Sequence, residues 1–178
     1  MLFDGRTSPQ WKFILTKDQS HIGFMVTSRS GLGHLRRVAS IAGAMKVEQP
    51  GVRIGLFTNA SITGLTRADM AAFNTSLVVD RSDMASIAAK CAARVVVADT
   101  MVPQGIEMLA AKVALILRET PNDRLDRLKL PGGRCWDLVL IPNPVDHWLP
   151  DFKLPFSNKV TATGWIYRKP LAEGPANR

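Results

Sequence analysis

The chain has 178 residues, which suits one compact domain, and its 46% hydrophobic and 21% charged residues are proportions of a globular protein, not a disordered one. No apolar run approaches the roughly 20 residues needed to span a bilayer, and the first 20 residues lack the continuous apolar core of a secretory signal, so a cytoplasmic location is expected. The net charge of +8 is spread over both halves of the chain without a basic arm. A diffuse charge of this kind fits an anionic small ligand or an anionic membrane surface as well as it fits nucleic acid, and because neither the charge nor the aromatic residues are concentrated, nucleic acid is not the expected partner.

The hydrophobic pattern alternates between short β-type runs and helical segments. Strands are predicted over 22–27, 52–58, 76–79, 94–98, 113–117, 137–141 and 160–163, and helices over 34–48, 66–73, 82–92, 104–112 and 122–130. Unbroken apolar strands separated by helices indicate parallel pairing with helices on both faces. The expected fold is therefore α/β, a Rossmann-like, doubly wound and mainly parallel sheet. It should occupy residues 20–169, after an extension over 1–19 and before a tail or interdomain linker over 170–178.

A glycine-containing loop follows the first predicted strand. It includes Ser28, Ser30, Gly31, Leu32 and Gly33, and a helix begins near His34. Glycines let the backbone approach a ligand closely, serines supply hydroxyl donors, and the amino end of a helix favours negative charge. Arg29, Arg36 and Arg37 add positive charge. Because ligands of doubly wound sheets bind beyond the carboxyl ends of the strands, this loop predicts a site for an oxygen-rich ligand, phosphorylated or sugar-like.

Two familiar nucleotide-binding loops do not fit these residues. The Walker loop requires a lysine directly after its second glycine, and His34 stands there instead. The dinucleotide fingerprint requires a third glycine or alanine where Arg36 stands, and an acidic residue at the end of the second strand, which is Thr58-Asn59 here. No nicotinamide or flavin cofactor is therefore expected. The helix dipole favours a neutral His34, which suits a general base, while capping of the helix or bonding to the loop is an equally weighted interpretation.

The segment Gly31-Leu-Gly-His-Leu-Arg-Arg37 resembles the loop of GT-B glycosyltransferases. It is most similar to bacterial transferases related to the enzyme that adds N-acetylglucosamine to the peptidoglycan lipid precursor. Later segments resemble that group in the same order, at 99–109, 117–119, 136–141 and 160–168. The resemblance covers roughly residues 20–169.

The resemblance implies the acceptor-binding half of an enzyme that moves a sugar from a nucleotide-sugar donor to a hydroxyl acceptor, which in this group can be lipid-linked. It implies His34 as the base, no bound metal or other cofactor, and contacts of Gly31 and Gly33 with the donor phosphates or the acceptor. The chain departs from the family because the donor-binding residues of a second domain are missing from it. Transfer would need a donor domain from a partner chain or from a longer protein, and the alternative function is a non-catalytic Rossmann-like module that binds a phosphorylated ligand or a partner protein.

Further candidate residues follow two of the predicted strands. Asp99, with Thr100 beside it, either faces the ligand or caps the helix predicted from residue 104. Arg118 and Glu119 either pair with each other or face the ligand. Two cysteines are too few for a zinc site, so no metal site is predicted. Segments around Trp11 and over 148–156 are candidates for contact with a membrane surface.

Overall fold

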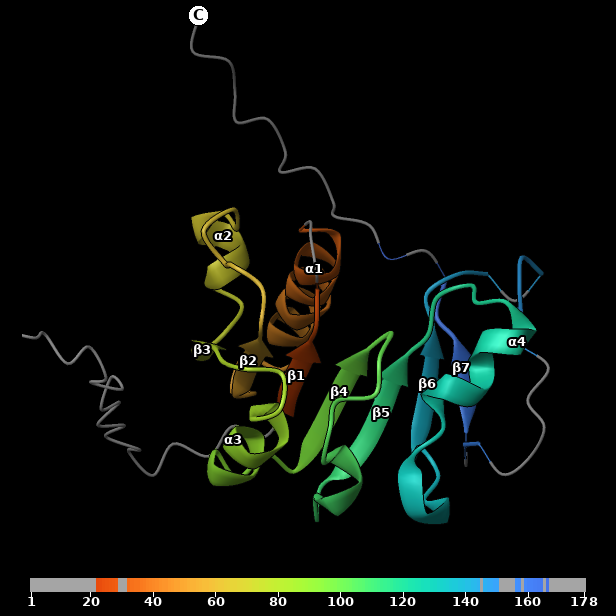
Figure 1. Cartoon of the computed structure of the whole chain (residues 1–178). Helices are drawn as coiled ribbons and strands as arrows, with labels where there is room; N and C mark the ends of the chain where they lie inside the picture. The colour runs from red at the N-terminus through yellow and green to blue at the C-terminus, as the bar shows by residue number, and fades with distance from the viewer. Residues whose placement is uncertain are drawn as a thin grey trace, which may run out of the picture.

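The computed structural model describes residues 22–28, 32–144, 146–150, 156–157, 159–164 and 166. In this part of the chain the strands form one parallel, seven-stranded sheet. The strand order is β3-β2-β1-β4-β5-β6-β7, and every neighbouring pair is parallel (Figure 1). The strands are β1 (Ile22–Val26), β2 (Ile54–Thr58), β3 (Thr75–Val78), β4 (Val95–Asp99), β5 (Lys112–Ile116), β6 (Leu138–Ile141) and β7 (Val160–Ala162). The predicted Rossmann-like α/β fold is confirmed. The predicted extension over 1–19 and the tail over 170–178 lie outside the described residues.

Two hydrophobic cores lie on the two faces of the sheet, because alternate residues of each strand point to opposite sides. Phe24 and Val26 of β1 pack with α1 (Gly33–Glu48) and with the residues after α2 (Arg67–Met70). Met25 of β1 belongs to the other core, which contains residues of four short helices. These are α3 (Met84–Lys90), η1 (Ile106–Met108), α4 (Asn122–Leu125) and η2 (Asp126–Leu128). Helices therefore cover both faces, as a doubly wound sheet requires.

Helix α1 fixes the position of the chain directly after β1. The apolar stripe of this helix is buried at Leu35, Val38 and Ala42, and Met45 packs against the same core while partly buried. Full burial of a Leu or Val side chain contributes about 1.5–3 kcal/mol, so this stripe holds the helix firmly against the sheet. The side chains of its first two turns are consequently held at the carboxyl edge of the sheet.

The prediction of a helix over 104–112 is wrong. Only the short 3-10 turn η1 forms, because Gly105 before it adopts the left-handed conformation (φ 80°), and β5 already begins at Lys112. The carbonyl groups of this segment are satisfied by a side chain instead of by a helix. The guanidinium group of Arg134 donates hydrogen bonds to the carbonyl oxygens of Ile106, Glu107, Leu109 and Ala111, at 2.7–3.4 Å. Arg134 lies 23 residues or more after these carbonyl groups in the sequence. The hydrophobic periodicity of residues 104–112 therefore could not indicate this contact.

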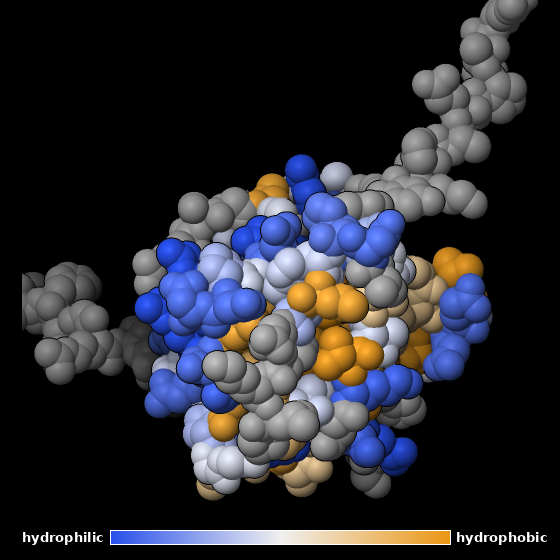
Figure 2. Space-filling model, turned by 90° about the vertical axis from the view of Figure 1, so that its right-hand side faces the viewer, coloured by the Kyte–Doolittle hydropathy of each residue, from blue (hydrophilic) through white to orange (hydrophobic). Residues whose placement is uncertain are grey.

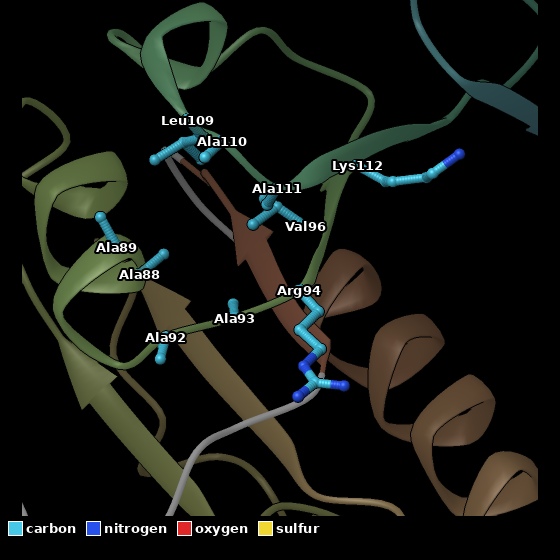
Figure 3. A pocket seen from close by; sticks show the side chains of 10 residues that line it. All are labelled: Ala88, Ala89, Ala92, Ala93, Arg94, Val96, Leu109, Ala110, Ala111 and Lys112. Atoms are coloured by element: carbon cyan, nitrogen blue, oxygen red, sulfur yellow. The ribbon is translucent and has the colours of Figure 1, made fainter.

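A hollow of about 400 Å³ lies between α3 and the segment after η1. Figure 3 shows alanine side chains of the α3 region on one side and residues 109–111 on the other. Arg94 and Lys112 stand at the amino ends of β4 and β5, so this hollow lies at the opposite edge of the sheet from the ends of the strands where ligands bind.

Three other helix boundaries differ from the predictions. Helix α2 spans only Arg67–Met70, and Thr66 and Asp69 form a capping box at its start. Helix α3 spans Met84–Lys90, which is shorter at both ends than the predicted 82–92, and no side chain caps it. The predicted helix over 122–130 divides into α4, which begins at Asn122 after Pro121, and η2.

Strand β7 lies at one edge of the sheet, where hydrophobic side chains are exposed among polar ones (Figure 2). Val160 of β7 is 40% exposed, and Leu149 is 49% exposed. On the α1 side, a hollow of about 460 Å³ is lined by Ile41, Met45 and Leu140, among other residues. None of the helices within the described ranges has the length and hydrophobicity to cross a membrane.

Candidate functional site

The strand order reverses between β1 and β4. From β1 the chain continues through α1 to β2 on one side, and from β4 it continues through η1 to β5 on the other. Val26 and Asp99, the last residues of the two strands, are register partners. In open α/β sheets the two chain paths separate at such a point, which leaves a crevice where ligands bind. The carboxyl ends of β1 and β4 are therefore the place in this fold where a site is expected.

Three charged or titratable side chains meet at this point. The side chain of Asp99 is fully buried, and its Oδ2 lies 2.9 Å from Nδ1 of His34. Nη2 of Arg37 lies 2.9 Å from both carboxylate oxygens of Asp99. His34 and Arg37 stand one turn apart on α1, so the helix presents both to the end of β4. A buried carboxylate requires such partners, because an isolated charge away from water is very costly.

The contacts of His34 favour one of its two neutral tautomers. Nη2 of Arg37 has two hydrogens and lies within 2.9 Å of three atoms: both oxygens of Asp99 and Nδ1 of His34. If Nδ1 accepted from Arg37, then Nδ1 and Oδ2 of Asp99 would be two acceptors facing each other at 2.9 Å, which is repulsive. If Nδ1 carries the proton, Nδ1 and Nη2 are two donors 2.9 Å apart, but both can direct their hydrogens to the carboxylate, Nδ1 to Oδ2 and Arg37 to both oxygens. We assign the Nδ1–H tautomer on this ground.

This assignment leaves Nε2 of His34 with its lone pair available. The imidazole is 26% exposed, and the described residues give Nε2 no hydrogen-bond partner. A neutral imidazole that is held by a carboxylate on one nitrogen and open on the other is the arrangement of a general base. The alternative that Asp99 caps a helix near residue 104 is wrong, because its carboxylate binds His34 and Arg37, and the 3-10 turn η1 that begins there has Gly105 at its cap and no side-chain cap.

Thr100 follows Asp99 in a strained conformation. Its φ is 59°, which is unusual for a β-branched residue, and its N–H donates to the carbonyl oxygen of Ile116 at 2.9 Å. Its Oγ1 lies 3.3 Å from Nδ1 of His34. Backbone strain of this kind costs about 1–3 kcal/mol and occurs most often at functional sites.

Thr100→Gly should raise the free energy of unfolding by up to about 1 kcal/mol, because relief of the strain exceeds the larger conformational entropy of glycine in the unfolded chain. Urea denaturation measures this change. Ala92 also has positive φ (51°) and lies away from the cluster, so Ala92→Gly is a matched control with the same expected sign. A loss of stability for Thr100→Gly together with a gain for Ala92→Gly would show that the Thr100 side chain is needed for structure.

The residues predicted to bind ligand in the loop after β1 do not all face the crevice. The N–H of Ser28 donates to Oδ1 of Asn59 at 3.0 Å, which joins the ends of β1 and β2. The side chain of Leu32 packs against the core, so close to Gly64 that any Cβ at residue 64 would overlap it. Gly33 is exposed as the first residue of α1. Ser30 and Gly31 lie outside the described residues.

Arg37, and not Arg36, joins the cluster. Arg36 is exposed, and the described residues give its guanidinium group no partner. The helical period explains the difference, because residues three apart share one face of a helix and residues two apart do not. Arg37 lies three residues after His34, so this spacing was the signal in the sequence that could have identified it.

Arg118 and Glu119 do not pair with each other. Oε2 of Glu119 lies 3.5 Å from Nε2 of His147, which the sequence did not single out as a site residue. Both predicted residues line a cavity of about 330 Å³ together with Arg37, Asn143 and His147. No signal in the sequence indicates this grouping, because it depends on how the turn after β6 folds back.

No group of three or more His, Cys, Asp or Glu side chains is placed to hold a metal ion within the described residues. Cys91 packs partly buried against the α3-side core, and burial raises the pKa of its thiol. Comparisons with protein-family models, with curated proteins and with solved structures found no match to this chain.

Proposed function

We propose that the crevice between β1 and β4 binds a hydroxyl-bearing ligand and that Nε2 of His34 removes the proton of that hydroxyl during transfer of a sugar. The observation that carries this proposal is the 2.9 Å contact between Nδ1 of His34 and the buried carboxylate of Asp99. In the assigned tautomer this contact orients the ring and leaves the lone pair on Nε2, which has no hydrogen-bond partner among the described residues.

The proposed reaction moves one proton and exchanges one bond at the sugar. The hydroxyl proton moves to Nε2 while the hydroxyl oxygen forms a bond to the anomeric carbon of a nucleotide-sugar. The bond between that carbon and the nucleoside diphosphate breaks, and the diphosphate leaves with the electron pair. Asp99 stabilises the imidazolium that results, since its carboxylate already accepts from Nδ1. The net charge of His34, Asp99 and Arg37 then rises from zero to +1, which favours an anion nearby.

Sugar transfer is favoured over other base-catalysed reactions by the resemblance of the segments at residues 31–37, 99–109 and 117–119 to GT-B glycosyltransferases. Within that proposal the chain is the acceptor-binding half, and a second domain or chain supplies the donor site. A non-catalytic module that binds a phosphorylated ligand is the second candidate. It is favoured by the first turn of α1, which has no acidic residue and no side-chain cap to satisfy its N–H groups.

A transfer assay discriminates between the two functions. The full chain, alone and with any protein that co-purifies with it, is incubated with UDP- and GDP-hexoses, and release of the nucleoside diphosphate is measured with and without hydroxyl acceptors. We expect release only with a donor-binding partner present, and its loss in His34→Ala. Release that His34→Ala leaves undiminished would contradict the role of His34 as base.

A further inference from the structure

A second cavity adjoins the cluster of His34, Asp99 and Arg37. It has a volume of about 330 Å³ and lies at the carboxyl ends of β5 and β6. Arg118 and Glu119 line it from the end of β5, and Asn143 and His147 line it from the turn after β6. Arg37 belongs to both, since it lines the cavity and binds Asp99. A ligand can therefore occupy the cavity and reach the crevice at the same time.

Two guanidinium groups offer unused donors to this cavity. Arg118 is exposed, and its guanidinium group has no partner within the described residues. Arg37 uses only Nη2 to bind Asp99 and approach His34, and Nη1 has no partner in the described part of the chain. Glu119 is the only carboxylate among the described residues that line the cavity, and it is directed to His147. Arg118 is therefore left without a neutralising side chain in contact among those residues.

Hydrogen bonds within the protein shape the part of the cavity that the turn after β6 forms. Asn143 is only 3% exposed, and its side-chain amide donates to the carbonyl oxygens of Pro144 and Trp148, both at 3.0 Å. These two bonds close the turn that carries His147 and hold His147 beside Glu119. A cavity that is shaped before the ligand arrives loses less entropy on binding than one that the ligand must order.

We infer that this cavity binds an oxyanion, a phosphate or a carboxylate, of the ligand whose hydroxyl group reaches His34. The planar guanidinium group of Arg118 matches the two oxygens of such a group, and Nη1 of Arg37 can bind it from the side of the crevice. The anion also balances the positive charge that the cluster acquires when His34 takes a proton. The inference rests on the proposed function in one respect, that the anion and the reacting hydroxyl belong to the same ligand. It adds the substrate class, which is an anionic sugar or an anionic hydroxyl acceptor.

Equilibrium binding of three hexoses to the full chain tests the inference. The probes are glucose 1-phosphate, glucuronate and uncharged glucose, measured by isothermal titration calorimetry at low and high salt. We expect at least one anionic probe to bind about 10-fold or more tightly than glucose, and its affinity to fall with salt. The preferred probe distinguishes a phosphate site from a carboxylate site.

Variants of Arg118 complete this test. Arg118→Ala should weaken binding of the preferred anion at least about 10-fold, and Arg118→Lys should weaken it less, because charge remains without the planar fork. Arg124→Ala removes an exposed arginine of α4 that does not line the cavity, and it should have no effect. Equal binding of all three probes, or no effect of Arg118→Ala, would overturn the inference. Probe binding involves no proton transfer, so this outcome and the outcome for His34 in transfer are independent.

Discussion

His34→Gln is expected to lower the rate of sugar transfer about 10²–10⁴-fold in the chain combined with its donor-binding partner, with little change in KM. Glutamine can still donate a hydrogen bond to Asp99, but it has no nitrogen that can accept a proton at neutral pH. The loss should therefore appear in kcat, because ground-state contacts with the substrate remain. Steady-state kinetics with saturating donor measure both constants.

The control for this variant lies on the same helix. Glu48→Gln changes an exposed residue at the other end of α1, and it should leave both constants unchanged. An increase in KM with normal kcat for His34→Gln would mean that His34 binds substrate without removing its proton.

The tautomer of His34 can be observed without any substrate. Nitrogen NMR of the imidazole should show a protonated Nδ1 and an Nε2 with a free lone pair, because Nδ1 donates to Asp99 at 2.9 Å. The opposite tautomer would mean that Nδ1 accepts from Arg37, and it would remove the basis of the proposed function. This measurement is informative even where transfer activity depends on a partner.

The sequence predicted the strands well because each is a short apolar run, and the central ones are buried on both faces. In β2 all five residues are buried, and in β4 and β5 four of five are buried. Such runs indicate a central parallel strand with little dependence on the rest of the chain. The position of the candidate site was indicated by the same pattern, because the carboxyl ends of parallel strands lie at one edge of the sheet, although the pattern did not predict that β1 and β4 are neighbours.

The parts that could not be predicted depend on contacts between distant residues. The 104–112 segment has helical periodicity, yet Gly105 and the guanidinium group of Arg134 stabilise an irregular path. The pairing of His147 with Glu119 likewise depends on Asn143, which closes the turn after β6. The helical spacing of His34 and Arg37 was available in the sequence, but only the position of Asp99 shows that Arg37 belongs to the cluster.

Asp99→Asn should lower the free energy of unfolding by about 3 kcal/mol and also reduce transfer. The fully buried carboxylate is the counter-ion of Arg37, whose side chain is only 17% exposed. Removal of one partner of a buried ion pair leaves the other charge uncompensated, which is more destabilising than removal of both. Urea denaturation measures the loss of stability.

The double variant separates the two roles of Asp99. Arg37→Met removes the uncompensated charge, so Asp99→Asn/Arg37→Met should recover much of the stability that Asp99→Asn alone loses. Transfer should not recover, because the side-chain amide that replaces the carboxylate can donate to Nδ1 of His34 and so favour the tautomer in which Nε2 carries the proton. Recovery of stability without activity would assign Asp99 to the orientation of the base as well as to the fold. Recovery of both would mean that Asp99 acts only as the counter-ion of Arg37, and that the tautomer of His34 is set by other groups.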